Sequence, residues 1–182
     1  MDLWTVGHST RTSEVFVSLL QAHRIETVAD VRRYPASRRH PHFNHDQLAA
    51  TLSTLSVDYV PMPDLGGRRS ARRDTHNTVW RDPSFRGYAD YMETPAFEAA
   101  LETLVALATT TRTAIMCAEA VWWQCHRQMI ADALKARAIR VLHIHDESRV
   151  TEHAFTSAAR IVEGRLQYGH ATDALHQFWD NA

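Results

Sequence analysis

The sequence contains little cysteine, almost no lysine and no long hydrophobic run. Cys117 and Cys125 are its two cysteines. Two are too few for a disulfide scaffold and fit a reducing compartment, where cysteines are more often structural, catalytic or metal-binding. No segment reaches the length of a membrane-spanning helix, and the first residues lack the charged start and apolar stretch of a signal peptide. The sequence therefore predicts a cytoplasmic protein with no membrane partner.

Motifs with well-defined chemistry are also missing. The sequence has no glycine-rich phosphate-binding loop, and the seven residues between Cys117 and Cys125 exclude a redox Cys-x-x-Cys pair. A phosphatase-type loop requires Cys, five residues and then Arg, but Trp123 stands at that position after Cys117. The formal net charge of -1 provides no global attraction to nucleic acid. The reaction class must therefore be inferred from less regular patterns.

The chain of 182 residues, 45% hydrophobic and 23% charged, has the composition of one folded domain. Segments with apolar residues at helical spacing alternate with β-rich runs at residues 3–6, 27–31, 57–62, 113–116 and 140–144. This alternation predicts an α/β fold over residues 1–182, a single domain with a mostly parallel sheet of about five strands and helices on both faces. We also expect a long polar loop at about 63–86, either a lid or disordered, and a helical C-terminal segment at about 151–180.

Two helices carry recognisable start signals. Asn44 followed by Gln47 resembles a capping box, in which the two side chains satisfy free backbone N–H groups. Thr94 before Pro95 is the second signal, because threonine caps helices and proline suits their first turn.

Polar residues follow every predicted strand. The carboxyl ends of parallel strands lie along one edge of a sheet, where loops and helix N-termini form ligand sites. We therefore expect one shared site there, with candidate residues at His8, Ser9, Asp30, Arg32, Gly66, Gly67, Cys117, Glu119 and His143.

The most informative segment is Cys117-Ala118-Glu119, followed after five residues by Cys125-His126-Arg127. If Cys125 lies in the first turn of a helix, the helix dipole and Arg127 or protonated His126 would lower its pKa and favour the thiolate. Glu119, partly desolvated in a crevice, would have a raised pKa and act as general acid or base. Cys117 is equally well explained as a small buried residue at a strand end.

Arginine supplies every basic residue except Lys135. Guanidinium groups suit phosphate contacts, and we expect Arg32 or Arg33 to border the crevice. A solvated basic face is the interpretation we favour for Arg72 and Arg73. The two clusters comprise Arg32, Arg33, Arg38 and Arg39, and then Arg68, Arg69, Arg72 and Arg73. Aromatic residues that would stack on a base or a sugar, or else pack in the core, are Tyr88, Trp122 and Trp123.

Twelve histidines raise the question of a metal site. The spacing of His40, His42 and His45 is loop-like and lacks the paired pattern of structural zinc, so we expect a solvated loop there. His8, His126 and His143 are better placed to meet the two cysteines, which leaves a transition metal in the crevice as an alternative. We assign no residue as a metal ligand.

These residues together resemble the domain of unknown function 488 family. The resemblance covers roughly residues 3 to 146 and rests on ordered motifs: Thr5-Val6-Gly7-His8-Ser9, Asp30-Val31-Arg32 with Pro35 and Ser37-Arg38, Phe43, Leu65-Gly66-Gly67, Phe85-Arg86-Gly87-Tyr88, Cys117-Ala118-Glu119 and Cys125-His126-Arg127. It implies a compact α/β domain whose shared site is formed by these positions, and it implies no particular reaction. The chain departs from the family pattern at Val121-Trp122-Trp123, where a proline is usual.

Three hypotheses follow for the function. The first is an enzyme acting on a phosphate-bearing nucleotide or nucleic acid component, with a Cys/His/Glu/Arg site at the strand ends. Its roles would be anion binding by Arg32, Arg38 and Arg127, acid or base chemistry by Glu119, and a nucleophile or proton relay formed by Cys125 with His126. The second is a non-catalytic nucleic-acid-binding module that uses the arginine-rich loop. The third is a metal or thiol redox sensor built on Cys117, Cys125 and a nearby histidine. The sequence determines neither the cofactor nor the oligomeric state.

Overall fold

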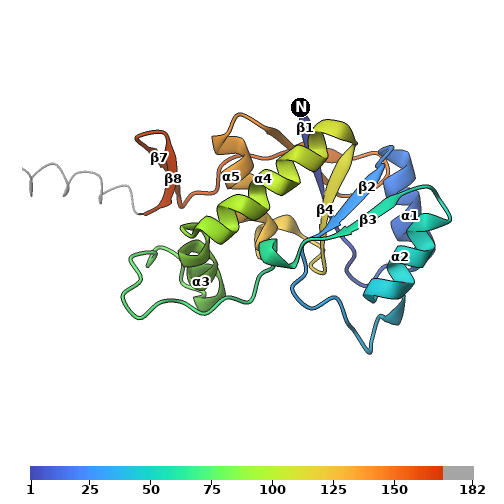
Figure 1. Ribbon diagram of the computed structural model, residues 1–182, viewed down its shortest axis with the longest axis horizontal. Helices are drawn as coiled ribbons and strands as arrows, with labels where there is room; N and C mark the ends of the chain where they lie inside the picture. Colours follow the sequence, from blue (N-terminus) through green and yellow to red (C-terminus); the bar gives the residue numbers. More distant parts are fainter. Residues whose placement is uncertain (170–182) are drawn as a thin grey trace, which may run out of the picture.

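The sheet of this α/β domain is mostly parallel, with the strand order β3-β2-β4-β1-β5-β6. The computed structural model describes residues 1–169 (Figure 1). In that range the main sheet contains β1 (Asp2–Gly7), β2 (Thr27–Asp30), β3 (Asp58–Pro61), β4 (Thr113–Cys117), β5 (Arg140–Ile144) and β6 (Val150–Glu152). The first five run parallel, and β6 pairs antiparallel with β5. The predicted α/β class and its five parallel strands are confirmed, and β6 adds a sixth strand to this sheet.

Helices cover both faces of the sheet (Figure 1). One face is covered by α1 (Ser13–Ala22) and α2 (His45–Ser53). Phe16 of α1 and Leu48 of α2 pack there against the apolar side chains that the strands direct to this face. The other face is covered by α4 (Pro95–Thr110) and α5 (Arg127–Ala136), and α3 (Pro83–Met92) joins the same core. Three short 3-10 helices complete the description: η1 (Pro41–Phe43), η2 (Pro63–Leu65) and η3 (Trp122–Gln124). Apolar packing thus covers both faces of the sheet, and polar side chains that bind a ligand can gather only along its edges.

The two predicted helix starts differ in outcome. Thr94 caps α4 as expected, because its hydroxyl accepts a hydrogen bond from the N–H of Phe97 at 3.3 Å. Asn44 precedes α2, but its side-chain oxygen accepts from the N–H of Ser37 at 2.6 Å and makes no capping bond. The capping-box prediction is therefore wrong, since the amide of Asn44 instead closes the loop that follows β2.

The predicted helix at about 151–180 is wrong for the part of it that the structure describes. Residues 150–168 contain β6 and a hairpin of β7 (Ala159–Val162) and β8 (Arg165–Tyr168). The hairpin turns at Glu163 and Gly164, whose φ angles of 49° and 76° suit the tight turn that matches strand twist. The remainder of the predicted helix, beyond residue 169, lies outside the described residues.

The polar segment predicted as a loop at about 63–86 is shorter than expected, because η2 ends at Leu65 and α3 begins at Pro83. The intervening loop, residues 66–82, is tied to α3 by one buried carboxylate. Asp90 accepts hydrogen bonds from the Arg72 N–H, the Thr75 hydroxyl and the Asn77 amide at 2.5–2.8 Å. The loop is therefore fixed by specific contacts and forms one wall of the site described below.

Within residues 1–169, no helix combines the length and the apolar character that crossing a membrane would require.

Candidate functional site

A cavity of about 310 Å³ lies beside the carboxyl ends of β2 and β4. The end of β4 and the turn before α5 form one wall, and the loop 66–82 and α3 form another. Its lining comprises Arg32, Arg33, Tyr34, Gly67, Arg68, Asp82, Ser84, Phe85, Tyr88, Cys117, Ala118, Glu119, Gln124, Cys125 and His126. The cavity therefore lies at the sheet edge where the strand-end residues were expected to gather.

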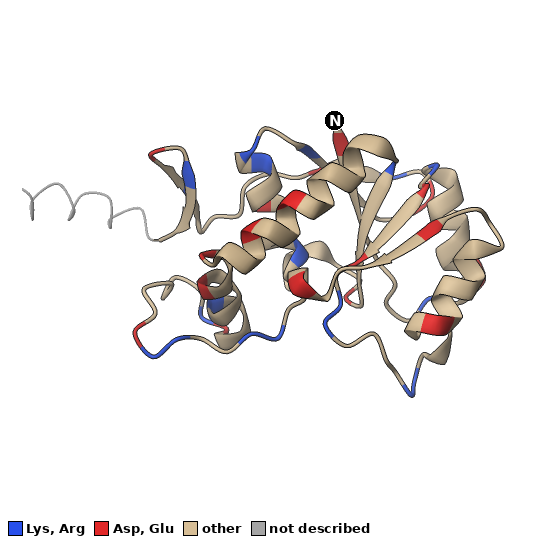
Figure 2. Ribbon diagram, in the orientation of Figure 1, with Lys and Arg blue, Asp and Glu red and all other residues tan. Residues whose placement is uncertain are grey.

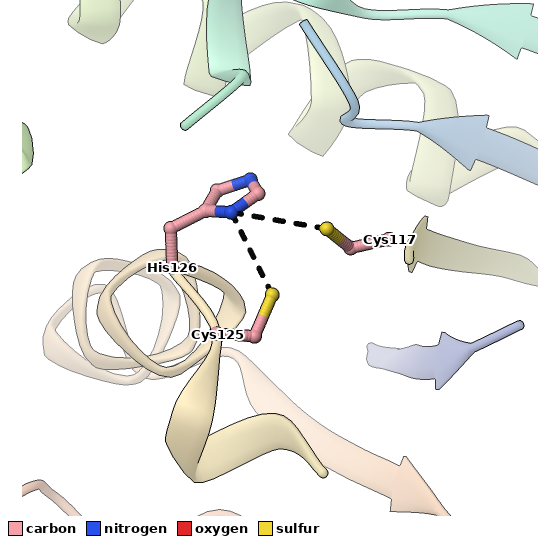
Figure 3. Close-up of side chains that lie close together, drawn as sticks. All are labelled: Cys117, Cys125 and His126. Carbon is pink, nitrogen blue, oxygen red and sulfur yellow. Dashed lines mark hydrogen bonds between the residues drawn. The ribbon is translucent and has the colours of Figure 1, made fainter. Parts of the chain in front are cut away.

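Cys117, Cys125 and His126 all line this cavity, and their side chains point toward one another (Figure 3). Cys117 is the last residue of β4, and Cys125 and His126 immediately precede α5. The Nδ1 atom of His126 lies 3.6 Å from the sulfur of Cys125 and 3.9 Å from that of Cys117. The two thiols are free and almost completely buried. Residues eight positions apart along the chain thus form one cluster.

The orientation of His126 follows from its other ring nitrogen. Nε2 lies 3.1 Å from the backbone carbonyl of Val31, which can only accept a hydrogen bond. Nε2 therefore carries the proton, and in the neutral ring Nδ1 turns a lone pair toward the two sulfurs. Tyr88 packs edge-on against the ring with a centroid separation of 5.1 Å.

The two thiols titrate in opposite directions. Burial by itself would raise the pKa of Cys125, but hydrogen bonds from Cys117 and His126, together with the charges of His126 and Arg127, hold it well below the usual value. The pKa of Cys117 is raised well above the usual value by its hydrogen bond to Cys125 and by burial. The surroundings of the pair therefore favour the thiolate at Cys125 over the thiolate at Cys117.

Arg127 lies behind Cys125 and does not line the cavity. Its Nε donates to the sulfur of Cys125 at 3.4 Å, and its Nη2 donates to the carbonyl of Glu119 at 2.5 Å. Gly7 leaves the space for this contact, since a Cβ there would lie 1.8 Å from the same carbonyl oxygen. The side chain expected to bind substrate thus supports the thiolate and fixes the turn that follows β4.

A second buried network lies beneath the cavity at the end of β2. Asp30 holds the guanidinium of Arg32 through contacts of 2.6–3.1 Å and accepts from the hydroxyl of Tyr59 at 2.6 Å. Arg32 in turn donates to Nε2 of His8 at 3.1 Å, and that ring stacks on Phe43. Burial and then Arg32 lower the pKa of His8 to about 4, so this imidazole is neutral at pH 7. Of these residues, Arg32 reaches the cavity, and His8 and Asp30 position it.

Several expected residues lie elsewhere. Arg38 is exposed on the loop after β2 and does not line the cavity, and neither do Ser9 and Gly66. Glu119 lines the cavity mouth, but its side chain is exposed, so the desolvation expected to tune it as an acid or base is missing. Gly67 lies against His126, and a Cβ there would be 2.9 Å from Nδ1.

The two arginine-rich loops lie at the same edge of the molecule, where Figure 2 shows basic residues along both. The side chain of Arg33 donates to the carbonyl of Arg68 at 3.2 Å, which joins the loops. Arg69 is stacked 3.6 Å from the ring of Tyr91, and Arg72 is paired with Glu93 and Asp90. Part of the second cluster is therefore engaged in internal contacts, not presented as a free basic face.

His143 does not approach the cysteines. It belongs to a buried chain in which Thr5 contacts His143 at 2.7 Å, His143 contacts His153 at 3.0 Å and His153 contacts Asp132 at 2.9 Å. Trp122 stacks on His143 with centroids 4.2 Å apart, so stacking anchors the η3 turn at the position where the family pattern has proline. Sequence reasoning missed Asp132 and His153. The sequence does contain an indication of Asp132, because this carboxylate falls on the otherwise apolar face of the predicted helix.

Three atoms of the kind that bind metals lie close together in the cluster. The sulfurs and the imidazole nitrogen all lie within 4.8 Å of one another. Two Cys and one His are a donor set that zinc uses, and its bond lengths place neighbouring S and N ligands about 3.6 Å apart. Within residues 1–169, no other group of three such side chains converges in this way, and His40, His42 and His45 do not.

Comparison with protein-family models gives a match over most of the chain. The family described as Domain of unknown function DUF488 matches residues 12–134, the segment that contains the loops of the cavity, Cys117, Cys125 and His126. No curated protein and no solved structure matches the chain.

Proposed function

The chain belongs to the domain of unknown function DUF488 family, and from that premise we propose that it is an enzyme whose reaction begins at the thiolate of Cys125. The substrate we propose is a nucleotide or another small phosphate-bearing molecule held in the cavity. The observation that carries the proposal is the position of Cys125, on the cavity wall and in contact with three groups that stabilise a negative sulfur.

The arrangement around Cys125 supports a nucleophilic role. A cysteine is reactive when its thiolate is stabilised and a small molecule can reach it. Cys125 is 3% exposed, yet it lines a cavity large enough for part of a nucleotide. In this proposal the Nδ1 atom of His126 accepts the proton from Cys125 and later returns it to the leaving group.

The residues at the mouth of the cavity support an anionic substrate less strongly than the surroundings of Cys125 support a nucleophile. Arg33 and Arg68 line it, and the carboxylates of Asp82 and Glu119 line it as well. Arg32 is already neutralised by Asp30. Phosphate binding therefore depends on Arg33 and Arg68, and Tyr34, which is 62% exposed, offers an aromatic face to a base.

The proposal is tested by measuring which nucleotides bind to the protein and which of them it converts to product. In thermal-shift titrations with nucleosides and their mono-, di- and triphosphates, at least one nucleotide should raise the melting temperature of the protein more than the corresponding nucleoside does. Combining Arg33→Gln with Arg68→Gln should abolish that binding, and Arg165→Gln, at an exposed position on the hairpin, should leave it unchanged. Product analysis with the bound ligand should show turnover that Cys125→Ser abolishes. Equal binding of nucleoside and nucleotide, or full turnover by Cys125→Ser, would contradict the proposal.

A metal centre is the second candidate, favoured by the convergence of the three ligand atoms. The hydrogen bond from His126 to Val31 is the kind of outer contact that orients a metal-bound imidazole. Cys117, Cys125 and His126 would hold a Zn²⁺ ion, and binding through both sulfurs would replace the nucleophilic role of Cys125. Elemental analysis of protein purified without a histidine tag decides between the candidates. One equivalent of metal, lost on Cys117→Ser, supports the metal centre, and metal-free active protein supports the thiolate.

A further inference from the structure

We propose that Cys117 and Cys125 form a reversible disulfide when a hydroperoxide enters the cavity, and that this bond switches the site off. The inference concerns regulation of the same site and rests on the proposed reactivity of Cys125.

The positions of the two sulfurs carry the inference. They are the two cysteines of the chain, they come from different elements, and their Sγ atoms lie within 4.8 Å of each other. A disulfide needs a separation of about 2.05 Å, which a side-chain rotation and a small backbone shift must supply. Both thiols are below 10% exposed, which prevents contact with the cysteines of another molecule. An intramolecular bond is therefore the product that the geometry favours.

The surrounding backbone allows the required shift. Residues 118–120, between the two cysteines, are exposed and belong to no helix or strand. The turn is held where the Ser9 N–H donates to the carbonyl of Ala118 at 2.9 Å, where Arg127 donates to the carbonyl of Glu119 and where Trp122 packs on His143. Bond formation therefore requires the segment around Cys125 to shift toward the end of β4 within this irregular stretch of backbone.

The chemistry balances with the peroxide as oxidant. The thiolate of Cys125 attacks one oxygen of the hydroperoxide, so that an S–O bond forms, the O–O bond breaks and the departing oxygen takes up a proton as an alcohol or water. The sulfur of Cys117 then attacks the sulfenic sulfur of Cys125. The S–S bond forms, the S–O bond breaks, and the hydroxide leaves as water with the proton of Cys117. Two electrons pass from the two sulfurs to the peroxide.

The two cysteines are suited to these different steps. His126 and Arg127 contact the sulfur of Cys125 at 3.6 and 3.4 Å, and the sulfur of Cys117 lies within 4.8 Å of it. Once the bond has formed, the sulfur of Cys125 is no longer a nucleophile. The same event also removes it as a metal ligand.

Mass spectrometry of peroxide-treated protein tests the inference. Reduced full-length protein is treated with one equivalent of hydrogen peroxide at pH 7 in the presence of a chelator, and its thiols are counted. We expect the thiol count to fall from two to none with a mass loss of about 2 Da, and dithiothreitol to restore both thiols.

Two variants make the outcome decisive. Cys117→Ser should stop at a sulfenic acid on Cys125 that a dimedone probe captures, and Cys125→Ser should leave Cys117 unoxidised. If wild-type protein accumulates the same dimedone adduct as Cys117→Ser, with no disulfide, the switch is wrong and the reactivity of Cys125 stands. If Cys117→Ser reacts with neither peroxide nor iodoacetamide, Cys125 is not an activated thiolate, and the proposed function fails together with the switch.

Discussion

His126 donates a hydrogen bond from Nε2 to the backbone carbonyl of Val31 across 3.1 Å. This bond joins the N-cap of α5 to the end of β2 and fixes which ring nitrogen carries the proton in the neutral imidazole. Nδ1 consequently faces Cys125 and Cys117, where it can take the proton of Cys125 and stay hydrogen-bonded to the resulting thiolate. One main-chain contact between two elements therefore determines the acid-base role that the histidine can take.

Replacing this histidine should slow the reaction of Cys125. His126→Ala removes one of the three groups that stabilise the thiolate, and we expect alkylation by iodoacetamide at pH 7 to slow by about tenfold. His45→Ala, at an exposed position on α2, serves as the matched control and should react at the wild-type rate. An unchanged rate in His126→Ala would show that the imidazole does not activate the sulfur.

A single methyl group on the loop 66–82 should disturb the same contact. In Gly67→Ala the new Cβ would lie 2.9 Å from Nδ1 of His126 and 3.2 Å from Cγ, which is too close, so the ring or the loop must shift and the contacts of Nδ1 with the sulfurs are disturbed. We expect alkylation of Cys125 to slow by about three- to tenfold, with the circular dichroism spectrum preserved. Ser70→Ala, at an exposed position in the same loop, should react normally. Alkylation of Gly67→Ala at the wild-type rate would show that packing of the loop against His126 does not affect Cys125.

The buried carboxylate on α5 should contribute strongly to stability. Asp132 accepts from His153, from the Tyr168 hydroxyl, and from both the N–H and the hydroxyl of Thr156. Asp132→Asn replaces one acceptor with a donor that faces other donors, and we expect the free energy of unfolding to fall by about 2–4 kcal/mol in urea titrations. Asp74→Asn, at an exposed position, should change it by less than about 0.5 kcal/mol. Equal effects in the two variants would contradict an organising role for Asp132.

Stability should also fall as the solution becomes acidic. Burial and Arg32 lower the pKa of His8 to about 4, whereas the unfolded value is about 6.5. The unfolded chain therefore binds the proton first, so the contribution of His8 is fully present above about pH 6.5 and is lost as the pH falls toward 4. Between pH 7 and pH 5 this group should cost about 1–2 kcal/mol.

The variant His8→Gln isolates that contribution, because glutamine keeps an acceptor for Arg32 and does not titrate. Its free energy of unfolding should depend less on pH over this interval than that of the wild type. The same slope in both proteins would show that His8 is not buried in its neutral form.

Hydrophobic spacing was sufficient to predict the five parallel strands and the sheet edge beside which the cavity lies. β5 has the predicted bounds, and the strand ends bring together Arg32, Cys117 and Cys125 because parallel strands all end at one edge. Periodicity does not determine where a loop side chain points, which is why Arg38 and Glu119 were expected deeper in the site. The hydrogen-bonded series from His143 through His153 to Asp132 depends on β6 and the hairpin. The many polar residues of that region gave no clear strand pattern in the sequence.

The pH profile of alkylation in two single-cysteine variants tests the activation of Cys125 most directly. Cys117→Ser keeps the contacts of Cys125 with His126 and Arg127, so the reaction of Cys125 with iodoacetamide should remain fast well below pH 8.5, which is about the ordinary pKa of a thiol. In Cys125→Ser the buried Cys117 lacks its thiolate partner and should react at least about 100-fold more slowly at pH 7. A slow Cys125 whose rate rises only near the ordinary thiol pKa, or a Cys117 that reacts as fast, would contradict the account.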